Sequence, residues 1–317
     1  MWRAGHCRAS KTSTSSRKPS RMSCRPMFAG RAHRNRTEPA AQDRRFGLGS
    51  LCYDRDGAME KADPSGTKFA LPREASRPDR LRAVSPEALA QILDAHRIYL
   101  ETNREQGTRA DLSAADLTGC DLSGKALRRI KLDHALLRNA NLADANLQRA
   151  NLIGADLAGA CLTGADLAGA RLAGANLDAA QIDGASFVGA DLEFALMTKA
   201  VLRQARLQGA DMSGVNLEGA DLRDADLRAA NLRGANLRRA YMDRADLRAA
   251  RLGGAFLDGA SLRQVDLRGA YLRVARFDGA DLSAADLRDT QGLVRAQLAT
   301  ALSLTDSRLP TGLSAPE

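Results

Sequence analysis

The sequence contains few of the residues that usually build an active site. Only four of its 317 residues are histidine, and aromatic residues make up 4% of the chain. Two of the histidines, His6 and His33, lie in an Arg- and Ser-rich stretch and belong to no recognisable catalytic set. Phosphate-binding motifs such as GxxxxGKS/T, or a GxGxxG after a strand, are also absent. We therefore predict a protein that is not an enzyme, with no catalytic residue, no cofactor and no small-molecule substrate.

The cysteine residues do not indicate a catalytic, disulfide or metal site either. The five cysteines are scattered, at Cys7, Cys24, Cys52, Cys120 and Cys161, without a CxxC pair. This spacing favours neither a disulfide framework nor a metal site. We expect Cys120 to be a small core residue and Cys161 to be exposed. No run of 18 apolar residues exists, so we predict no transmembrane segment, and the cysteine usage favours a reducing, cytoplasmic location.

What the chain has instead is a strict period of five. From Leu112 to Leu287 every fifth residue is apolar, which gives thirty-six consecutive units, and thirty of these positions are Leu. We call this residue the centre; minus-two and minus-one precede it, and plus-one and plus-two follow it. Minus-two is nearly always Ala, and minus-one is commonly Asp or Asn. The centre is not Leu at Ile182, Phe187, Met197, Met212, Met242 and Phe277.

A period of five fits neither regular element. Successive Leu would spiral around an α-helix and would alternate between the two faces of a straight strand. Leu and Ala can share one interior only if the chain turns a corner in every unit. Four corners close a coil of about 20 residues, and coils stack about 4.8 Å apart. We therefore predict an all-β solenoid of about nine coils over residues 110–290, with Leu112, Leu152, Leu192, Leu232 and Leu272 in its core.

Units such as Ala155-Asp156-Leu157-Ala158-Gly159 and Ala165-Asp166-Leu167-Ala168-Gly169 resemble the pentapeptide-repeat family. The resemblance covers somewhat more than half of the chain. It implies a right-handed quadrilateral β-helix with the centre and minus-two residues inside. Some members of that family imitate duplex DNA and shield DNA gyrase from inhibitors. The later segment Ala296-Gln297-Leu298 is similar to the closing segment that members often carry.

Both ends of such a solenoid need a cap, because an open end exposes apolar side chains and unpaired backbone. We expect an N-terminal capping helix over residues 85–107, since Ser85 suits the N-cap, Pro86 the first turn and Gly107 the position past the end. The register breaks after Leu287. Residues 291–317 are then expected to form a short helical C-terminal cap and a polar tail.

Three polar residues near the start of the repeat need an explanation. His96 lies on the apolar face of the expected helix, and we predict a packed core residue there. His134 falls at a turn and should be solvated. Lys125 replaces Ala at minus-two, and we expect its side chain to reach toward solvent.

Residues 1–75 are rich in Arg, Ser, Pro and Gly and show no apolar periodicity. We predict a disordered basic segment. Three interpretations stay open: a tail that touches nucleic acid or an anionic surface, a transit-like presequence, or a stretch upstream of the true start at Met59. Mass spectrometry of the native N-terminus would distinguish them.

The triplet Asp-Leu-Arg recurs every 20 residues, which places its copies on one wall of the solenoid. This candidate interaction wall comprises Asp226, Arg228, Asp246, Arg248, Asp266, Arg268, Asp286 and Arg288. Each Arg can reach its own Asp, and such exposed pairs contribute at most about 1 kcal/mol each. The wall is either a self-compensated solvated surface or a docking strip for a protein or nucleic acid partner.

Taken together, these features predict a protein-interaction scaffold that presents rigid flat walls to an unknown protein partner, as a monomer or an end-to-end dimer. The first alternative is the DNA-mimicking, gyrase-protecting role that the resemblance implies. Residues 110–290 hold 23 Lys+Arg against 24 Asp+Glu, a net of −1, which is a poor imitation of DNA. The second alternative is binding of nucleic acid or an anionic surface through the Arg columns and the basic tail, which the scarcity of aromatic residues weakens.

Overall fold

The structure is a computed structural model that describes residues 52–53, 59–62, 68–69 and 81–314. The strands β1 (Cys52–Tyr53), β2 (Met59–Ala62) and β3 (Lys68–Phe69) pair as an antiparallel sheet in the order β1-β2-β3. This sheet belongs to a separate unit from residues 81–314. Its sequence predicted no regular structure, because strands of two to four residues are too short to show a period. The rest of the segment 1–75 lies outside the described residues.

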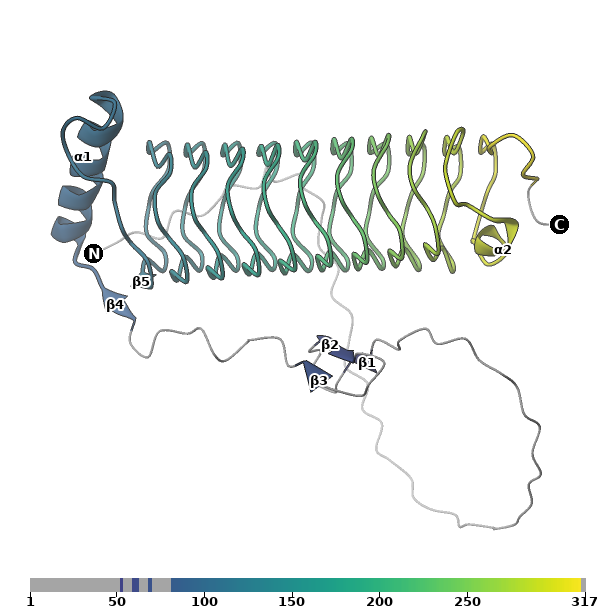
Figure 1. Cartoon of the computed structure of the whole chain (residues 1–317), viewed down its shortest axis with the longest axis horizontal. Helices are drawn as coiled ribbons and strands as arrows, with labels where there is room; N and C mark the ends of the chain where they lie inside the picture. Colours follow the sequence, from purple (N-terminus) through teal and green to yellow (C-terminus); the bar gives the residue numbers. More distant parts are fainter. Residues whose placement is uncertain (1–51, 54–58, 63–67, 70–80, 315–317) are drawn as a thin grey trace, which may run out of the picture. The chain divides into compact units, whose positions relative to one another are not determined.

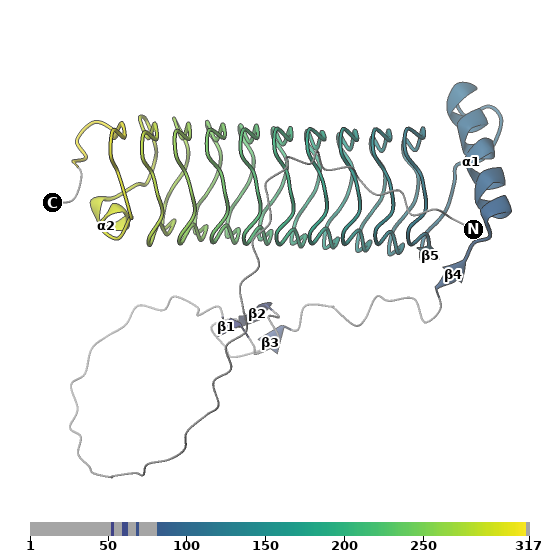
Figure 2. The same ribbon diagram turned by 180° about the vertical axis from the view of Figure 1, so that it is seen from behind.

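The repeat forms a four-sided β-helix. From Asp111 to Tyr271, each minus-one residue forms a parallel bridge with the residue 20 positions later, as Asp111 does with Lys131. The chain therefore closes one coil every four units, and the coils stack along the column that begins at β5 in Figure 1 and is seen from behind in Figure 2. We name the walls by their first minus-one residue: wall A starts at Asp111, wall B at Asp116, wall C at Asp121 and wall D at Ala126.

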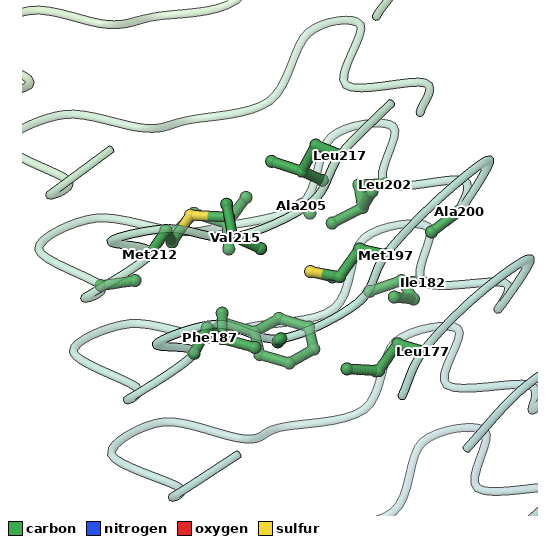
Figure 3. Packing of buried hydrophobic residues seen from close by; sticks show 14 of the residues in the cluster. Leu177, Ile182, Phe187, Met197, Ala200, Leu202, Ala205, Met212, Val215 and Leu217 are labelled. Carbon is green, nitrogen blue, oxygen red and sulfur yellow. The ribbon is translucent and has the colours of Figure 1, made fainter. Parts of the chain in front are cut away.

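The interior is a column of Leu and Ala, as predicted. Leu112, Leu152, Leu192, Leu232 and Leu272 are all fully buried, and the Ala residues at minus-two are buried beside the centre residues. Figure 3 shows larger side chains, such as Phe187, Met197 and Met212, packed into the same interior as Leu177 and Leu202. Flexible Met side chains can fill the gaps that such changes in size leave. Lys125 is exposed at its minus-two position, which confirms the prediction for that side chain.

Every backbone N–H of a typical unit has a hydrogen-bond partner within the column, so the walls need no other element to satisfy their backbone. The N–H groups of the minus-one, centre and plus-two residues bond to neighbouring coils, and that of the next minus-two residue closes the turn. The plus-one N–H donates to the minus-one side chain. In the unit that starts at Ala155 these bonds measure 2.6–3.2 Å. The Asp and Asn residues at minus-one are therefore structural acceptors, for example Asp156 for the N–H of Ala158.

Each corner is a tight turn whose plus-two residue adopts a left-handed conformation. Over the repeat these residues have φ between 53° and 69°. Glycine adopts this conformation freely, and many units have it, but Arg129, Ala229 and Val274 adopt it too. The left-handed conformation costs a non-glycine residue about 1–2 kcal/mol. The sequence predicted a turn in every unit but did not show which of its two residues becomes left-handed.

The helix α1 (Pro86–Glu101) precedes the first coil. The side chain of Ser85 accepts a hydrogen bond from the Ala88 N–H, as an N-cap residue does. The helix ends six residues before the predicted boundary at 107, because Asn103 and Arg104 have φ of 51° and 80°. Gly107 instead packs against the helix, where a Cβ would lie 2.3 Å from the Ala95 carbonyl oxygen.

Helix α1 contacts the first coil through two buried residues. Leu89 joins the hydrophobic cluster of the solenoid, and His96 is fully buried, as predicted for a core residue. Burial lowers the pKa of His96, so Nδ1 of the neutral ring can accept a hydrogen bond of 3.1 Å from the Ala110 N–H. In addition, β4 (Arg82–Ala83) pairs in parallel with β5 (Ala115–Asp116) and covers part of the first coil's edge. The sequence did not predict this strand pairing.

At the far end the ladder continues beyond Leu287, where we had expected its register to end. The short helix α2 (Arg295–Leu298) interrupts it, and the bridges then resume with a spacing of 22 residues, at Ser303 and Arg308. The amide of Gln297 donates to the carbonyl oxygens of Leu272 (2.8 Å) and Ala275 (2.7 Å). A side chain here replaces backbone donors of the missing wall, which periodicity alone could not show.

The prediction that Cys161 is exposed was wrong. Cys161 is only 7% exposed, at a position that bridges Asn141 and Gln181 of the adjacent coils; Asp221 and Asn236 are buried to a similar degree. His134 is half-buried, and its ring lies over Gly154 of the next coil. Cys120 is half-buried and packs against the core.

Candidate interaction surface

The Asp-Leu-Arg triplets bring each guanidinium group onto its own carboxylate. In the triplet of Asp246 and Arg248, Nε lies 2.9 Å from Oδ1 and Nη2 lies 2.6 Å from Oδ2. The other three triplets on wall D, at 226–228, 266–268 and 286–288, repeat this two-pronged geometry. Each Arg therefore reaches its own Asp, as the two-residue spacing predicted.

The pairs are also linked from coil to coil. Nε of Arg228 lies 3.7 Å from the Asp246 carboxylate, and Nε of Arg248 lies 3.6 Å from that of Asp266. Arg268 continues the series to Asp286 at 3.8 Å. The result is an alternating chain of charges along wall D, which we call the Asp–Arg strip. Alternation offsets the repulsion between like charges that are stacked about 4.8 Å apart.

Hydrogen bonding keeps the strip ionised. Burial alone would raise the pKa of Asp226 and of Asp266, but hydrogen bonds from Arg228 and Arg268 outweigh it and hold both pKa values below the ordinary value. The hydrogen bond from Arg288 likewise lowers the pKa of Asp286. The same bonds raise the pKa values of the Arg partners. These pairs consequently carry both charges at neutral pH.

Part of each guanidinium group remains available to a partner. The Arg side chains of the strip are 42–48% exposed, against 18–27% for the Asp side chains. Nε and Nη2 hold the carboxylate, whereas Nη1 makes no hydrogen bond to the described residues 81–314. The strip therefore presents a row of fixed, outward donors between partly covered carboxylates.

Two further charge arrangements escaped the sequence reasoning. On wall B, Arg238 (3.2 Å) and Arg276 (3.0 Å) share the carboxylate of Asp258, with the Arg238 guanidinium 4.5 Å from the centre of the Phe256 ring. On wall A, Lys131 pairs with Asp111 at 2.8 Å, but Asp191, Asp211 and Arg251 further along the wall form no ion pair within the described residues 81–314. The minus-one column of wall A can be found by reading every twentieth residue from Asp111, but it contains no repeated motif comparable to the Asp-Leu-Arg triplet.

The described residues do not assemble a recognisable catalytic or metal centre. His96 lies under the first coil and His134 lies at a corner between walls A and B. Within residues 81–314 no three His, Cys, Asp or Glu side chains are placed to hold a metal ion. No helix of the described part is both long and apolar enough to cross a bilayer.

A column of stacked coils, held together by backbone pairing around a Leu-Ala interior, defines a β-helical repeat protein. The profile of pentapeptide repeats matches eight copies, at residues 107–124, 130–168, 160–193, 185–224, 225–264 and 257–290. These residues make up more than half of the chain, and the chain belongs to the pentapeptide-repeat family. Its fold is the right-handed quadrilateral β-helix of that family, as predicted.

Solved structures place the chain among several members of the family. It is similar to HetL, a pentapeptide-repeat protein involved in heterocyst differentiation regulation from the cyanobacterium Nostoc sp. strain PCC 7120, with 40% identity and a TM-score of 0.57 over 62% of this chain and 85% of HetL. It is also similar to trypsin-treated QnrB1, a plasmid-mediated fluoroquinolone resistance protein, with 20% identity and a TM-score of 0.45 over 57% of this chain and 88% of QnrB1. The QnrB1 likeness is too distant to bear on function. A comparison with curated proteins finds no match.

Proposed function

We propose that this protein is a non-enzymatic interaction scaffold that docks a protein partner on wall D. The observation that carries the proposal is the Asp–Arg strip, from Asp226 to Arg288, in which each guanidinium group is fixed by its carboxylate and still half exposed. We further propose that the scaffold works in the cytoplasm, because the spacing of its cysteines favours a reducing compartment.

A wall of this kind suits docking because it needs little ordering. Association is opposed by the entropy of fixing long side chains, and Arg side chains already held in place lose less of it. Arg is also among the residues that contribute most at protein interfaces. The backbone beneath the strip has its hydrogen bonds satisfied by neighbouring coils, so the surface stays flat when it meets a partner.

The charge pattern favours a protein partner over a DNA-related role. Duplex DNA carries one sign of charge at a density of about one per 1.7 Å, whereas the strip alternates between Asp and Arg along its whole length. Such alternation is poorly suited both to imitating DNA and to binding it. A relative with 40% identity, HetL, is involved in regulation, which fits a scaffold without chemistry of its own.

The proposal can be tested by quantitative affinity capture from an extract of the producing organism. The variant R248Q/R268Q removes two charges from the centre of the Asp–Arg strip. The matched control R238Q/R276Q removes two paired Arg charges from wall B, on the opposite side of the column. We expect the same proteins to be retained by the unmodified chain and by the control, and at least one of them to be lost with R248Q/R268Q.

Two results would contradict the docking role of wall D. The first is that R248Q/R268Q retains every protein that the unmodified chain retains. The second is that no protein is retained more strongly than on a column without the chain. Circular dichroism of all three proteins shows that the fold is intact before the comparison is made.

A further inference from the structure

Beyond the Asp111–Lys131 pair, wall A carries surface charges that the described residues 81–314 do not neutralise. Within residues 81–314, no ion pair is formed by the acidic side chains of Asp191, Glu193 and Asp211, or by the basic side chains of Arg171, Arg233, Arg251 and Arg273. All of these side chains except the half-buried Asp191 are exposed. Two apolar residues of the same wall are exposed as well, Tyr271 at 44% and Val274 at 68%.

These charges are ordered along the wall. The acidic residues occupy two adjacent coils, at Asp191, Glu193 and Asp211. Three of the basic residues occupy the next three coils, at Arg233, Arg251 and Arg273, and Arg171 lies in the coil before Asp191. A surface with an acidic stretch beside a basic stretch of similar length is complementary to itself when one copy is reversed. Two-fold symmetric dimers are built from patches with this property.

We propose that two copies of this chain associate through wall A, side by side and antiparallel. The two-fold axis lies midway between the coils of Asp211 and Asn231. In this arrangement, Asp191 faces Arg251 of the second copy, and by symmetry Arg251 faces Asp191 of the second copy. Asp211 faces Asn231 of the second copy, which can donate a hydrogen bond to it. Each protomer thus contributes the Asp to one of these two symmetry-related ion pairs and the Arg to the other.

The remaining side chains of the minus-one column fit the same register. Arg171 comes opposite Tyr271 of the second copy, where the guanidinium group can stack on the exposed ring. Asn151 comes opposite Gln291 of the second copy. No two like charges meet along this column.

The corner positions that flank wall A are compatible as well. Glu193 comes opposite Gly253 of the second copy, which lies between Arg233 and Arg273 in adjacent coils. Val274 comes opposite Gly174 of the second copy, so that an exposed side chain meets a residue that has none. At the other corner, Asp289 comes opposite Arg149 of the second copy, and these two charges are opposite in sign.

A shift of the axis by half a coil destroys this match. If the axis passes through the coil of Asp211, that carboxylate meets its own copy and Arg171 meets Arg251. If the axis passes through the coil of Arg233, the two copies of that Arg meet. Juxtaposed like charges are strongly unfavourable at an interface, so the charges select one register among neighbouring ones.

This arrangement has a consequence for the scaffold role. A two-fold axis that lies in the interface and perpendicular to the column leaves wall D of both copies on the same side of the dimer. The two Asp–Arg strips then form one broader surface, and a partner that contacts both would bind with higher avidity. The dimer itself does not depend on the docking proposal, because purified protein suffices to test it.

Sedimentation equilibrium of the purified full chain over the micromolar range tests the inference. We expect a monomer–dimer equilibrium that weakens as salt is raised, because the facing charges are partly exposed. R251D and D191R should each raise the dissociation constant at least about tenfold, since each change alters two symmetry-related pairs. Both substitutions place at minus-one a residue that already occurs there in other units, so the fold should tolerate them.

The charge exchange D191R/R251D provides the decisive comparison. It restores opposite charges across both symmetry-related pairs, and we expect the dissociation constant to return to within about threefold of the original value. The control R206D changes an exposed Arg at a minus-one position of wall D that forms no ion pair within residues 81–314, and it should leave the equilibrium unchanged. Small-angle scattering of the dimer should show a maximum dimension close to that of the monomer, not the doubled length of an end-to-end dimer.

Four outcomes would overturn the proposal. They are a chain that stays monomeric throughout the concentration range, a dimer that R251D leaves intact, a dimer that R251D weakens but the charge exchange fails to restore, and a dimer twice as long as the monomer. The last outcome would support contact through the ends of the column instead.

Discussion

Walls A and D of the solenoid have the same backbone and the same core but opposite ways of treating charge. On wall D every Arg of the Asp-Leu-Arg column holds a carboxylate of its own triplet, and three of them lie near the next one as well. On wall A, Arg233, Arg251 and Arg273 form no ion pair within residues 81–314. The two walls differ in where their opposite charges lie. On wall D each Arg is at plus-one of a unit that has Asp at minus-one, so the two side chains are neighbours. On wall A these Arg residues and the acidic residues lie in different coils.

The comparison teaches that the repeat separates stability from recognition. The buried Leu and Ala residues and the backbone ladder are common to all four walls, so they hold the column together without regard to the surface. The minus-one and plus-one positions are then free to vary, and their charges determine what each wall can bind. Changes in the core should therefore act alike under both walls, whereas changes at the surface should not.

The largest effect is expected from the shared core. Leu227 lies beneath wall D and Leu232 beneath wall A, and both are fully buried. Replacing either with Ala should reduce the free energy of unfolding by about 2–5 kcal/mol, because it removes buried methyl groups and leaves a cavity. Urea denaturation of L227A and L232A measures this. A difference of several kcal/mol between the two would show that the walls do not share one uniform core.

The next effect concerns a buried, paired carboxylate on wall C. Burial would raise the pKa of Asp221, but hydrogen bonds from Arg223 and Arg203 lower it to about 2, compared with about 3.9 in an unfolded chain. Its contribution, on the order of 2 kcal/mol, is present above about pH 4 and is lost as the pH falls toward 2. The stability difference between the unmodified chain and D221N should therefore shrink as the pH falls from 5 to 2.

The pH dependence can be checked with a second variant. R223Q removes one of the two guanidinium donors, so the pKa of Asp221 should rise, and the acid-induced loss of stability should be smaller and complete at a higher pH. Urea denaturation at several pH values follows both variants. A constant difference between the unmodified chain and D221N throughout this range would contradict the assigned pKa.

A smaller effect is expected at the corner that follows wall A. Gly254 has a φ of +68°, whereas the adjacent Gly253 is not left-handed and would accept a Cβ at ordinary contact distance, 3.7 Å from the Arg273 carbonyl oxygen. G254A should cost about 1 kcal/mol, because alanine is strained in a left-handed turn. G253A should be neutral or slightly stabilising. Equal costs for the two variants in thermal unfolding would show that the turn conformation is wrongly assigned.

The smallest effect separates the two walls directly. R248Q on wall D breaks an ion pair and should lower the free energy of unfolding of the monomer by less than about 1 kcal/mol, since the side chain is half exposed. R251Q on wall A breaks no ion pair that the described part of the chain contains, and it should leave the free energy of unfolding of the monomer unchanged. Measurement at protein concentrations below the dimer range isolates this difference. A larger loss with R251Q than with R248Q would reverse the assignment of the two walls.

Periodicity predicted most of this architecture because the repeat leaves few alternatives. The burial of Leu232 and its equivalents follows from a five-residue rhythm that only a cornered chain can bury. The ion pairs of Arg248 and its equivalents follow from their distance of two residues from an Asp. Even the packing of His96 could be inferred from its place on an apolar helix face.

What the sequence did not reveal depends on contacts across coils or on irregular backbone. The hydrogen bonds from Gln297 to the last coil and the pairing of Arg82–Ala83 with the first coil lie outside the five-residue repeat. The periodicity of the sequence therefore could not predict them. The burial of Cys161 depends on its neighbours 20 residues away in either direction. The complementarity of wall A appears only when residues from six coils are placed in one column.

Pulsed electron paramagnetic resonance between pairs of spin labels on wall C tests the stacked column most directly. Labels would replace Ser123 together with either Arg203 or Arg263, in a background without other cysteines; these plus-one positions are separated by 80 and 140 residues. Coils of 20 residues that stack about 4.8 Å apart predict distances of about 19 Å and 34 Å, with narrow distributions. Distances that fail to grow in proportion to sequence separation would contradict the four-sided column on which every wall depends.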